Sequence, residues 1–174
     1  MNSEYCNQNT YDAIQIHGGS GFMMEYPIQR YYRDARITSI YEGTTQLQVV
    51  AAIRYVTNGS YLAQMREFEQ AEVSEDLKGI QARAKAMADK FEEAVAHVKE
   101  AADQPFHDLC ARHLVEMAAD VIMLHLLLHN ATANADMFGK SVRVYANFVE
   151  AEIAKHHTFV MNLNPADIND YVQA

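Results

Sequence analysis

Apolar side chains recur at intervals of three and four residues along most of the chain beyond residue 74. The first series comprises Leu77, Ile80, Ala84, Met87, Phe91, Ala94, Val95 and Val98. This spacing places the series on one face of an α-helix. Ser74, followed by two acidic residues, suits a helix start, and Asp103-Gln-Pro105 ends the run.

Two further series predict two more long helices. The first comprises Leu114, Met117, Val121, Leu124 and Leu128, within a helix expected over residues 106–138 and closed by Gly139. The second comprises Val142, Tyr145, Val149, Ile153 and Val160, in a helix that Ser141 would cap. The middle of the 106–138 segment is apolar almost all round, which predicts the buried helix of a bundle. Met87, Met117 and Met123 are expected to fill its core.

Shorter helices separated by glycine and proline are predicted before residue 72. They are expected over residues 3–16, 27–36, 44–58 and, less regularly, 60–70. The glycines at 18, 19 and 21 end the first helix and form a loop. Pro27 opens the second helix, while Thr44 caps the third and Gly59 ends it. Neither a strand pattern nor an internal repeat is evident, so the fold class is predicted to be all-α.

Composition divides the chain near residue 60. Five of the seven glycines and eight of the ten tyrosines lie at or before Tyr61, and the remainder is rich in Ala, Met, Leu and Glu. We therefore expect residues 1–58 to carry the site and residues 59–174 to form a plain helical bundle. Residues 72–164 should fold without the first part, because each of their three long helices has an apolar face.

Charge and cysteine content narrow the compartment and the partners. The net charge is −9, and residues 1–60 hold five acids and four bases, so most of the excess lies beyond them. Without a basic patch, nucleic acid and anionic membrane are not expected as partners. Cys6 and Cys110 form no CxxC pair, which favours a reducing compartment. The polar start and the short apolar run 121–128 favour a cytoplasmic protein.

A chemically rich segment lies between residues 15 and 46. It contains Gln15-Ile-His-Gly-Gly-Ser-Gly-Phe22, Glu25-Tyr-Pro27, Tyr32-Arg-Asp-Ala35 and Ile40-Tyr-Glu-Gly-Thr-Thr-Gln46. Glu42 stands beside Gly43, just before the helix that Thr44 caps. Glycine permits close approach of a ligand, and a helix N-terminus offers amide donors to anions. Taken alone, Glu42 could equally be a first-turn glutamate favoured by the helix dipole.

Together, in this order and spacing, these motifs resemble the flavin-binding and catalytic segment of the acyl-CoA dehydrogenases, over roughly residues 3–56. The resemblance implies FAD-dependent oxidation of an acyl-CoA to the trans-2-enoyl-CoA. Glu42 would be the base that removes the substrate α-proton, while the β-hydrogen leaves as hydride to the flavin. The backbone N–H of Glu42 would hydrogen-bond the thioester carbonyl. Gly43 matches a substrate-contacting position.

The resemblance also implies cofactor contacts and partners. The positions that match a segment lying against the adenylate half of FAD, bound mainly by a neighbouring subunit, are Gln15, Ile16, His17, Gly18 and Gly19. The positions that match contacts near the ribityl-pyrophosphate portion are Thr44, Thr45 and Gln46. The implied partners are the acyl-CoA substrate, further copies in a homodimer or homotetramer, and an electron-transferring flavoprotein as acceptor.

The domain organisation follows from the same resemblance. Residues 1–58 would be the end of the family's C-terminal helical domain, and residues 59–174 are similar in position and pattern to the extra C-terminal helical module of longer members. The family's flavin-holding β domain has no counterpart here, so we expect a fragment that is inactive alone. The alternative left open is a stand-alone helical interaction or oligomerisation module without catalysis.

The eight histidines raise a second alternative, a metal-binding bundle. His125 and His129 are four residues apart, as in helical metal pairs, but no third ligand is identifiable. No histidine has a glutamate three residues before it, as a di-iron bundle requires. His156 and His157 are adjacent on a helix and face different ways. We therefore expect no metal site, and expect satisfied core or rim histidines instead.

Overall fold

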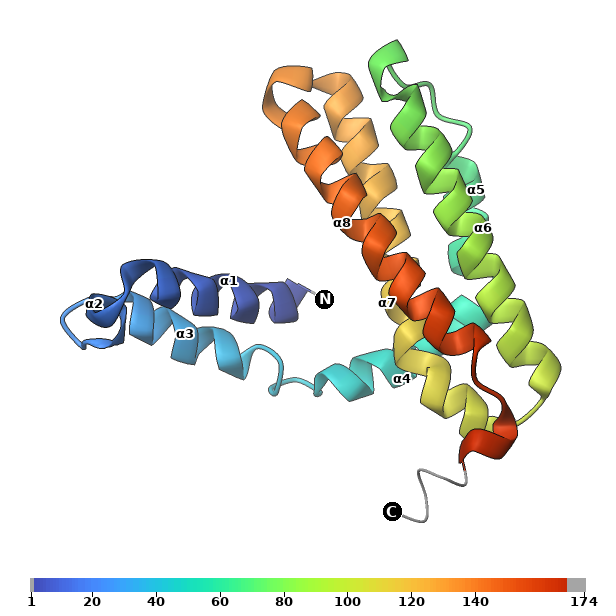
Figure 1. Ribbon diagram of the computed structural model, residues 1–174, viewed down its shortest axis with the longest axis horizontal. Coiled ribbons are helices and arrows are strands. Elements are labelled where there is room, and N and C mark those ends of the chain that lie inside the picture. The colour runs from blue at the N-terminus through green and yellow to red at the C-terminus, as the bar shows by residue number, and fades with distance from the viewer. Residues whose placement is uncertain (1, 169–174) are drawn as a thin grey trace. The chain divides into compact units, whose positions relative to one another are not determined.

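The computed structural model describes residues 2–168 of the 174-residue chain. Its helices are α1 (Asn2–His17), α2 (Gly19–Phe22), α3 (Ile28–Ile37), α4 (Thr45–Thr57), α5 (Ser60–Phe68), α6 (Lys78–Ala101), α7 (Gln104–Ala133) and α8 (Ala135–Met161), with 3-10 turns η1 (Glu75–Leu77) and η2 (Pro165–Asp167) (Figure 1). No strand occurs among these residues, so the predicted all-α class is confirmed. The chain divides into two compact units, Met1–Val49 and Val50–Ala174.

In the first unit, α1 and α3 lie side by side as an antiparallel pair, with α2 in the connection between them (Figure 1). The Asn7 side chain donates a hydrogen bond to the Ala35 carbonyl at 3.0 Å and so joins the two helices. Gly21 is buried in α2, where an added Cβ would lie 2.6 Å from the Ile14 carbonyl oxygen. Only glycine therefore allows α2 to fold back onto α1 this closely.

Large apolar side chains of the first unit remain in solvent. Ile16 is 84% exposed, Phe22 82% and Met24 86%. Several tyrosines on α1 and α3 are exposed as well. The first unit therefore buries its large apolar side chains less completely than a closed helical core does.

The second unit is a bundle of α6, α7 and α8, with α5 packed against α7 (Figure 1). Most of the predicted apolar positions form its core, since Leu77, Phe91, Leu114, Leu124 and Ile153 are all 1% exposed or less. Val95 and Tyr145 are only half-buried. The expectation for Met123 is wrong, because its side chain is 43% exposed on the outer face of α7. Met65, which the spacing did not single out, is fully buried on α5.

α7 has the apolar composition of a buried helix. It is 30 residues long and, by length and composition alone, apolar enough to cross a membrane. Half of its most apolar stretch is buried inside the bundle. That burial is typical of the core helix of a helical bundle.

The boundary between α7 and α8 differs from the prediction. α7 ends at Ala133 and α8 begins at Ala135, so Gly139 and Ser141 lie within α8. Asn134 breaks the helix with φ −147° and ψ 86°, and its side chain accepts a hydrogen bond from the Met137 N–H at 3.1 Å. Asparagine is a strong N-cap, so this side chain starts α8 earlier than Ser141 would.

Candidate functional site

Glu42 lies in the connection between α3 and α4 and has a left-handed backbone. Its φ is 53°, and that of Gly43 is 97°. A left-handed conformation is natural for glycine but costs another residue about 1–3 kcal/mol, and such strain concentrates at functional sites. A glycine at position 43 is compatible with a left-handed backbone, so the sequence allows that conformation there. Nothing in the sequence predicted it for Glu42.

Short-range hydrogen bonds hold this turn in place. Thr44 Oγ1 accepts from the Leu47 N–H at 3.4 Å, so Thr44 caps α4 as predicted. The Gln48 side-chain amide donates to the Glu42 carbonyl, also at 3.4 Å. The Thr45 N–H donates to the Ser39 carbonyl and ties the start of α4 to the end of α3. The backbone of the turn at Glu42 is therefore held by hydrogen bonds to the chain on both sides of it.

The turn borders a cavity of about 210 Å³ with many polar groups in its wall. Glu42, Gly43, Thr45 and Gln48 line one part of it, and Ser3 contributes from the start of α1. Among residues 2–168, no backbone carbonyl accepts a hydrogen bond from the N–H of Glu42 or Gly43 outside the helices. The cavity therefore combines an exposed carboxylate with adjacent amide donors that can hydrogen-bond a ligand.

The second group of predicted site residues, Gln15 to Gly19, lies at the other end of α1. All five are exposed. Gly18 has φ 59° and ψ −143°, a conformation that is essentially restricted to glycine. An added Cβ at Gly18 or Gly19 would have no heavy atom within 4 Å, so the backbone there faces open space. His17 Nδ1 lies 2.9 Å from the Ala13 carbonyl, to which it can donate within its own helix.

The two groups of predicted site residues both lie in the first unit, but the structure does not bring them close together. Ser3 lines the Glu42 cavity, and Gln15 lies twelve residues further along α1. At 1.5 Å per residue, this is a separation of about 18 Å along the helix axis. Thr44 and Gln46 are exposed beside the Glu42 turn. A ligand of one site and a ligand of the other would therefore contact opposite ends of the α1–α3 pair.

The two groups offer different surfaces to a ligand. The side-chain-free backbone at Gly18 and Gly19 leaves room for the close approach of a flat ring. The first turn of α4, with Thr45 and Gln46, offers amide and polar side-chain groups of the kind that bind phosphate. Among residues 2–168, no group of three or more His, Cys, Asp or Glu side chains could hold a metal ion.

A histidine pair in the second unit is a further polar cluster that the sequence analysis missed. His113 and His156 face each other across α7 and α8, with 2.8 Å between their Nδ1 atoms. His156 Nε2 lies 3.2 Å from a carboxylate oxygen of Glu116. An Nε2–H that donates to Glu116 leaves His156 Nδ1 as the acceptor of the His113 Nδ1–H. Burial lowers the pKa of both histidines.

The other histidines bear on the metal alternative. His157 Nε2 lies 2.9 Å from a carboxylate oxygen of Glu93 on α6, so the neighbours His156 and His157 do face different helices. His125 is 4% exposed, but its Nε2 has no hydrogen-bond partner within the described part of the chain. The expectation of a satisfied core histidine is therefore wrong for His125.

Comparison with known proteins places both halves of the chain in one family. Residues 1–56 match the family model described as acyl-CoA dehydrogenase, C-terminal domain, and residues 57–168 match the one described as acyl-CoA dehydrogenase C terminal. A solved acyl-CoA dehydrogenase family protein from Porphyromonas gingivalis is 38% identical, with a TM-score of 0.62, over 66% of this chain and 99% of that one. The chain belongs to the acyl-CoA dehydrogenase family.

Curated relatives match over a shorter stretch. The short-chain specific acyl-CoA dehydrogenase of Rattus norvegicus is 56% identical over 46 residues, which are 26% of this chain and 11% of the relative. The caffeyl-CoA reductase-Etf complex subunit CarC of Acetobacterium woodii is 54% identical over 46 residues, again 26% of this chain and 12% of the relative. The acyl-CoA dehydrogenase of Bacillus subtilis is 47% identical over 49 residues, 28% of this chain and 13% of the relative. The alignments thus span only about an eighth of these proteins.

Proposed function

We propose that this chain contributes the catalytic base and part of the cofactor site of an FAD-dependent acyl-CoA dehydrogenase. The enzyme oxidises an acyl-CoA to the trans-2-enoyl-CoA. Family membership supports the reaction class, and the names of the relatives support a CoA thioester as substrate. The oxidation needs a base for the α-proton and an acceptor for the β-hydride, and when bound the flavin supplies that acceptor.

Glu42 is the proposed base. Its carboxylate would take the proton from the α-carbon of the thioester, and its backbone N–H would donate to the thioester carbonyl as negative charge develops there. The observation that carries this assignment is the turn itself, in which Glu42 and Gly43 both have positive φ beside a polar cavity. The turn holds a carboxylate and an amide donor together at one place, which is what proton removal beside a carbonyl requires. Gly43 would contact the substrate.

The cofactor contacts are proposed to involve two subunits. Thr44, Thr45 and Gln46 would contact the FAD of the same subunit as Glu42, near its ribityl-pyrophosphate portion. Gln15, Ile16, His17, Gly18 and Gly19 would lie against the adenylate half of a neighbour's FAD. The separation of the two groups along α1 supports this division, because a single cofactor beside Glu42 need not also reach Gln15.

The partners follow from the same proposal. A homodimer or homotetramer would cover the exposed Ile16, Phe22 and Met24 of the first unit. An electron-transferring flavoprotein is the proposed electron acceptor, and a relative whose name includes an Etf complex supports it. We propose a cytoplasmic location. The 174-residue chain alone is proposed to be inactive, since it carries only part of the cofactor contacts.

Deuterium exchange at the substrate α-carbon tests the base directly. In the whole enzyme, Glu42→Gln should slow α-deuterium uptake from D₂O, without electron acceptor, by on the order of 10²–10⁴-fold. The amide keeps the size of the side chain but cannot accept the proton. Glu75→Gln, at an exposed glutamate of η1, is the control and should exchange at the wild-type rate. Unchanged exchange in Glu42→Gln would show that the base is another residue.

A further inference from the structure

A second pocket lies within the helical bundle, far along the chain from Glu42. Its volume is about 280 Å³, and its lining comes from the end of α5, the loop before η1, α6 and α7. Phe68, Val73 and Leu128 give it a largely apolar wall. This volume is close to the lower end of the range of small-molecule sites, about 300–1,000 Å³. The pocket can therefore hold a molecule the size of one aromatic ring with substituents.

One polar group in this wall has no partner. His125 lines the pocket, is 4% exposed, and its Nε2 makes no hydrogen bond to any described residue. Leaving a buried polar atom unpaired costs about 1–3 kcal/mol, so such atoms are rare in native structures. A ligand group in the pocket that hydrogen-bonds Nε2 would remove this cost.

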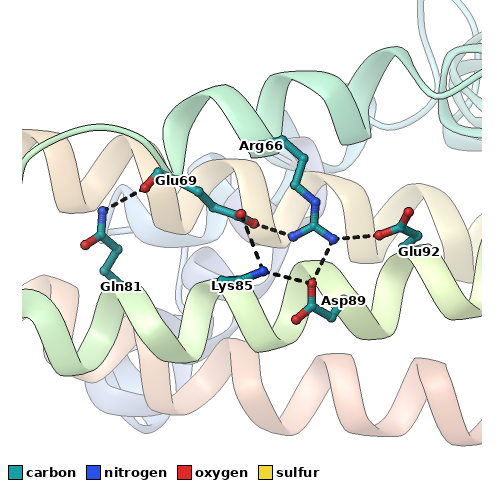
Figure 2. Close-up of polar contacts among 6 residues, drawn as sticks. All are labelled: Arg66, Glu69, Gln81, Lys85, Asp89 and Glu92. Carbon is teal, nitrogen blue, oxygen red and sulfur yellow. Dashed lines mark hydrogen bonds and ion pairs between the residues drawn. The ribbon is translucent and has the colours of Figure 1, made fainter.

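The wall of the pocket is held in place by a polar network (Figure 2). The Gln81 side chain donates to the Glu69 carbonyl at 3.3 Å and to the Ala71 carbonyl at 2.8 Å. The Glu69 carboxylate in turn pairs with Arg66 at 2.7 Å and with Lys85 at 3.8 Å. Because these bonds fix the loop after α5 onto α6, the pocket exists before any ligand enters. Binding then requires little ordering of the chain.

The charges around the pocket restrict the ligand. Burial lowers the pKa of His125, with the Glu69 carboxylate acting in the opposite direction, so the imidazole is neutral near pH 7. Glu72 stands exposed in the pocket lining and would repel an anion. A cation would have to leave water for an apolar wall. The Phe68 and His125 rings, 5.9 Å apart, offer two aromatic surfaces to a flat molecule.

We propose that this pocket binds a small, uncharged aromatic molecule with one hydroxyl group, and that the hydroxyl hydrogen-bonds His125 Nε2. The ring packs between Phe68, Val73 and Leu128. Glu72, an exposed residue of the lining, disfavours the ionised analogue. The site is separate from the proposed reaction at Glu42, and its occupancy does not depend on FAD.

A matched pair of probes tests the proposal on the full 174-residue chain. p-Cresol and toluene share a shape and differ in one hydroxyl, and each is titrated to millimolar concentration while the backbone amides are followed by NMR. p-Cresol should shift the amides of residues 68–73 and 125–129 saturably. It should bind about threefold to tenfold more tightly than toluene, the fold-change equivalent to one net hydrogen bond.

Variants assign the effect to His125. His125→Phe should bind both probes equally, whereas His129→Phe, at an exposed lining position, should keep the preference for p-cresol. Ala71→Trp, also exposed, should fill the pocket and abolish binding while His125 stays in place. The proposal is overturned if neither probe saturates or if the shifts lie elsewhere. It is equally overturned if the p-cresol preference survives in His125→Phe, or if binding survives in Ala71→Trp.

Discussion

The left-handed backbone of Glu42 is the residue-level feature on which the proposed chemistry depends. A right-handed residue at this place would continue the turn after α3 and point its side chain elsewhere. Gln48 and Thr44 stabilise the turn from the first residues of α4. The motif around Glu42 was readable from the sequence, but its backbone conformation was not. That conformation results from closing the turn between two helices, not from any preference of glutamate.

Two buried histidines, His125 and His156, and the half-buried His113 make stability depend on pH. Burial is the main cause that lowers the pKa of His113, His125 and His156 below 6.5. In the unfolded chain each has its ordinary pKa near 6.5, so on acidification the unfolded state takes up protons first. Their contribution to the free energy of unfolding is therefore complete above about pH 6.5. It falls as the pH falls towards the lowered folded-state values.

Urea unfolding between pH 8 and pH 5 measures this dependence. His125→Phe should reduce the slope of the free energy of unfolding against pH, by at most about 1.4 kcal/mol per pH unit, which is the limit for one proton. His129→Gln, on an exposed part of α7, serves as the control and should leave the curve unchanged. A wild-type curve that rises as the pH falls from 6.5 to 5, or a curve that His125→Phe leaves unaltered, would contradict the assignment.

At the scale of elements, the connection between α7 and α8 shows where sequence patterns stop being informative. The apolar series of both helices were predicted correctly, because burial repeats every three to four residues. The break was placed at Gly139, a good helix terminator, but it occurs at Asn134. Either residue could end a helix on local grounds. Which of them does so depends on how α8 packs back onto α7. Sequence spacing alone does not contain that packing energy.

Gly139→Ala distinguishes the two boundaries experimentally. Within α8 the glycine has no backbone need for flexibility, and an added Cβ would have no atom within 4 Å. Alanine should therefore raise the free energy of unfolding by about 0.5–1 kcal/mol. Gly59→Ala is the matched control, because Gly59 has φ 88° and the substitution should destabilise. Destabilisation of similar size in Gly139→Ala would indicate that Gly139 ends a helix after all.

At the scale of the whole molecule, the two units differ in how completely they bury their apolar residues. The second unit encloses its core within the end of α4 and α5 to α8, whereas the first leaves Ile16, Phe22 and Met24 in solvent. Composition alone indicated that the part beyond residue 60 is a bundle. The apolar spacing did not show that α5 contributes to the core, because α5 has one fully buried residue, Met65, in a weakly periodic segment.

Two truncated chains test the independence of the bundle. Residues 59–174 should melt cooperatively, since they retain α5 against α7. Residues 72–164 should fold with lower stability, by about 2–5 kcal/mol, because losing Met65 leaves the apolar surface of α7 uncovered. Circular dichroism during thermal and urea unfolding gives both quantities. A non-cooperative melt of residues 59–174, or equal stability of the two chains, would contradict this account.

Anaerobic single-turnover reduction tests the central claim, that Glu42 is the base. The whole enzyme is mixed with acyl-CoA without an electron acceptor, and the loss of the oxidised flavin absorbance is followed by stopped flow. Glu42→Gln should retain FAD yet lose absorbance on the order of a thousandfold more slowly than the wild type, within the usual range for a general base. Flavin reduction at close to the wild-type rate in Glu42→Gln would contradict the account.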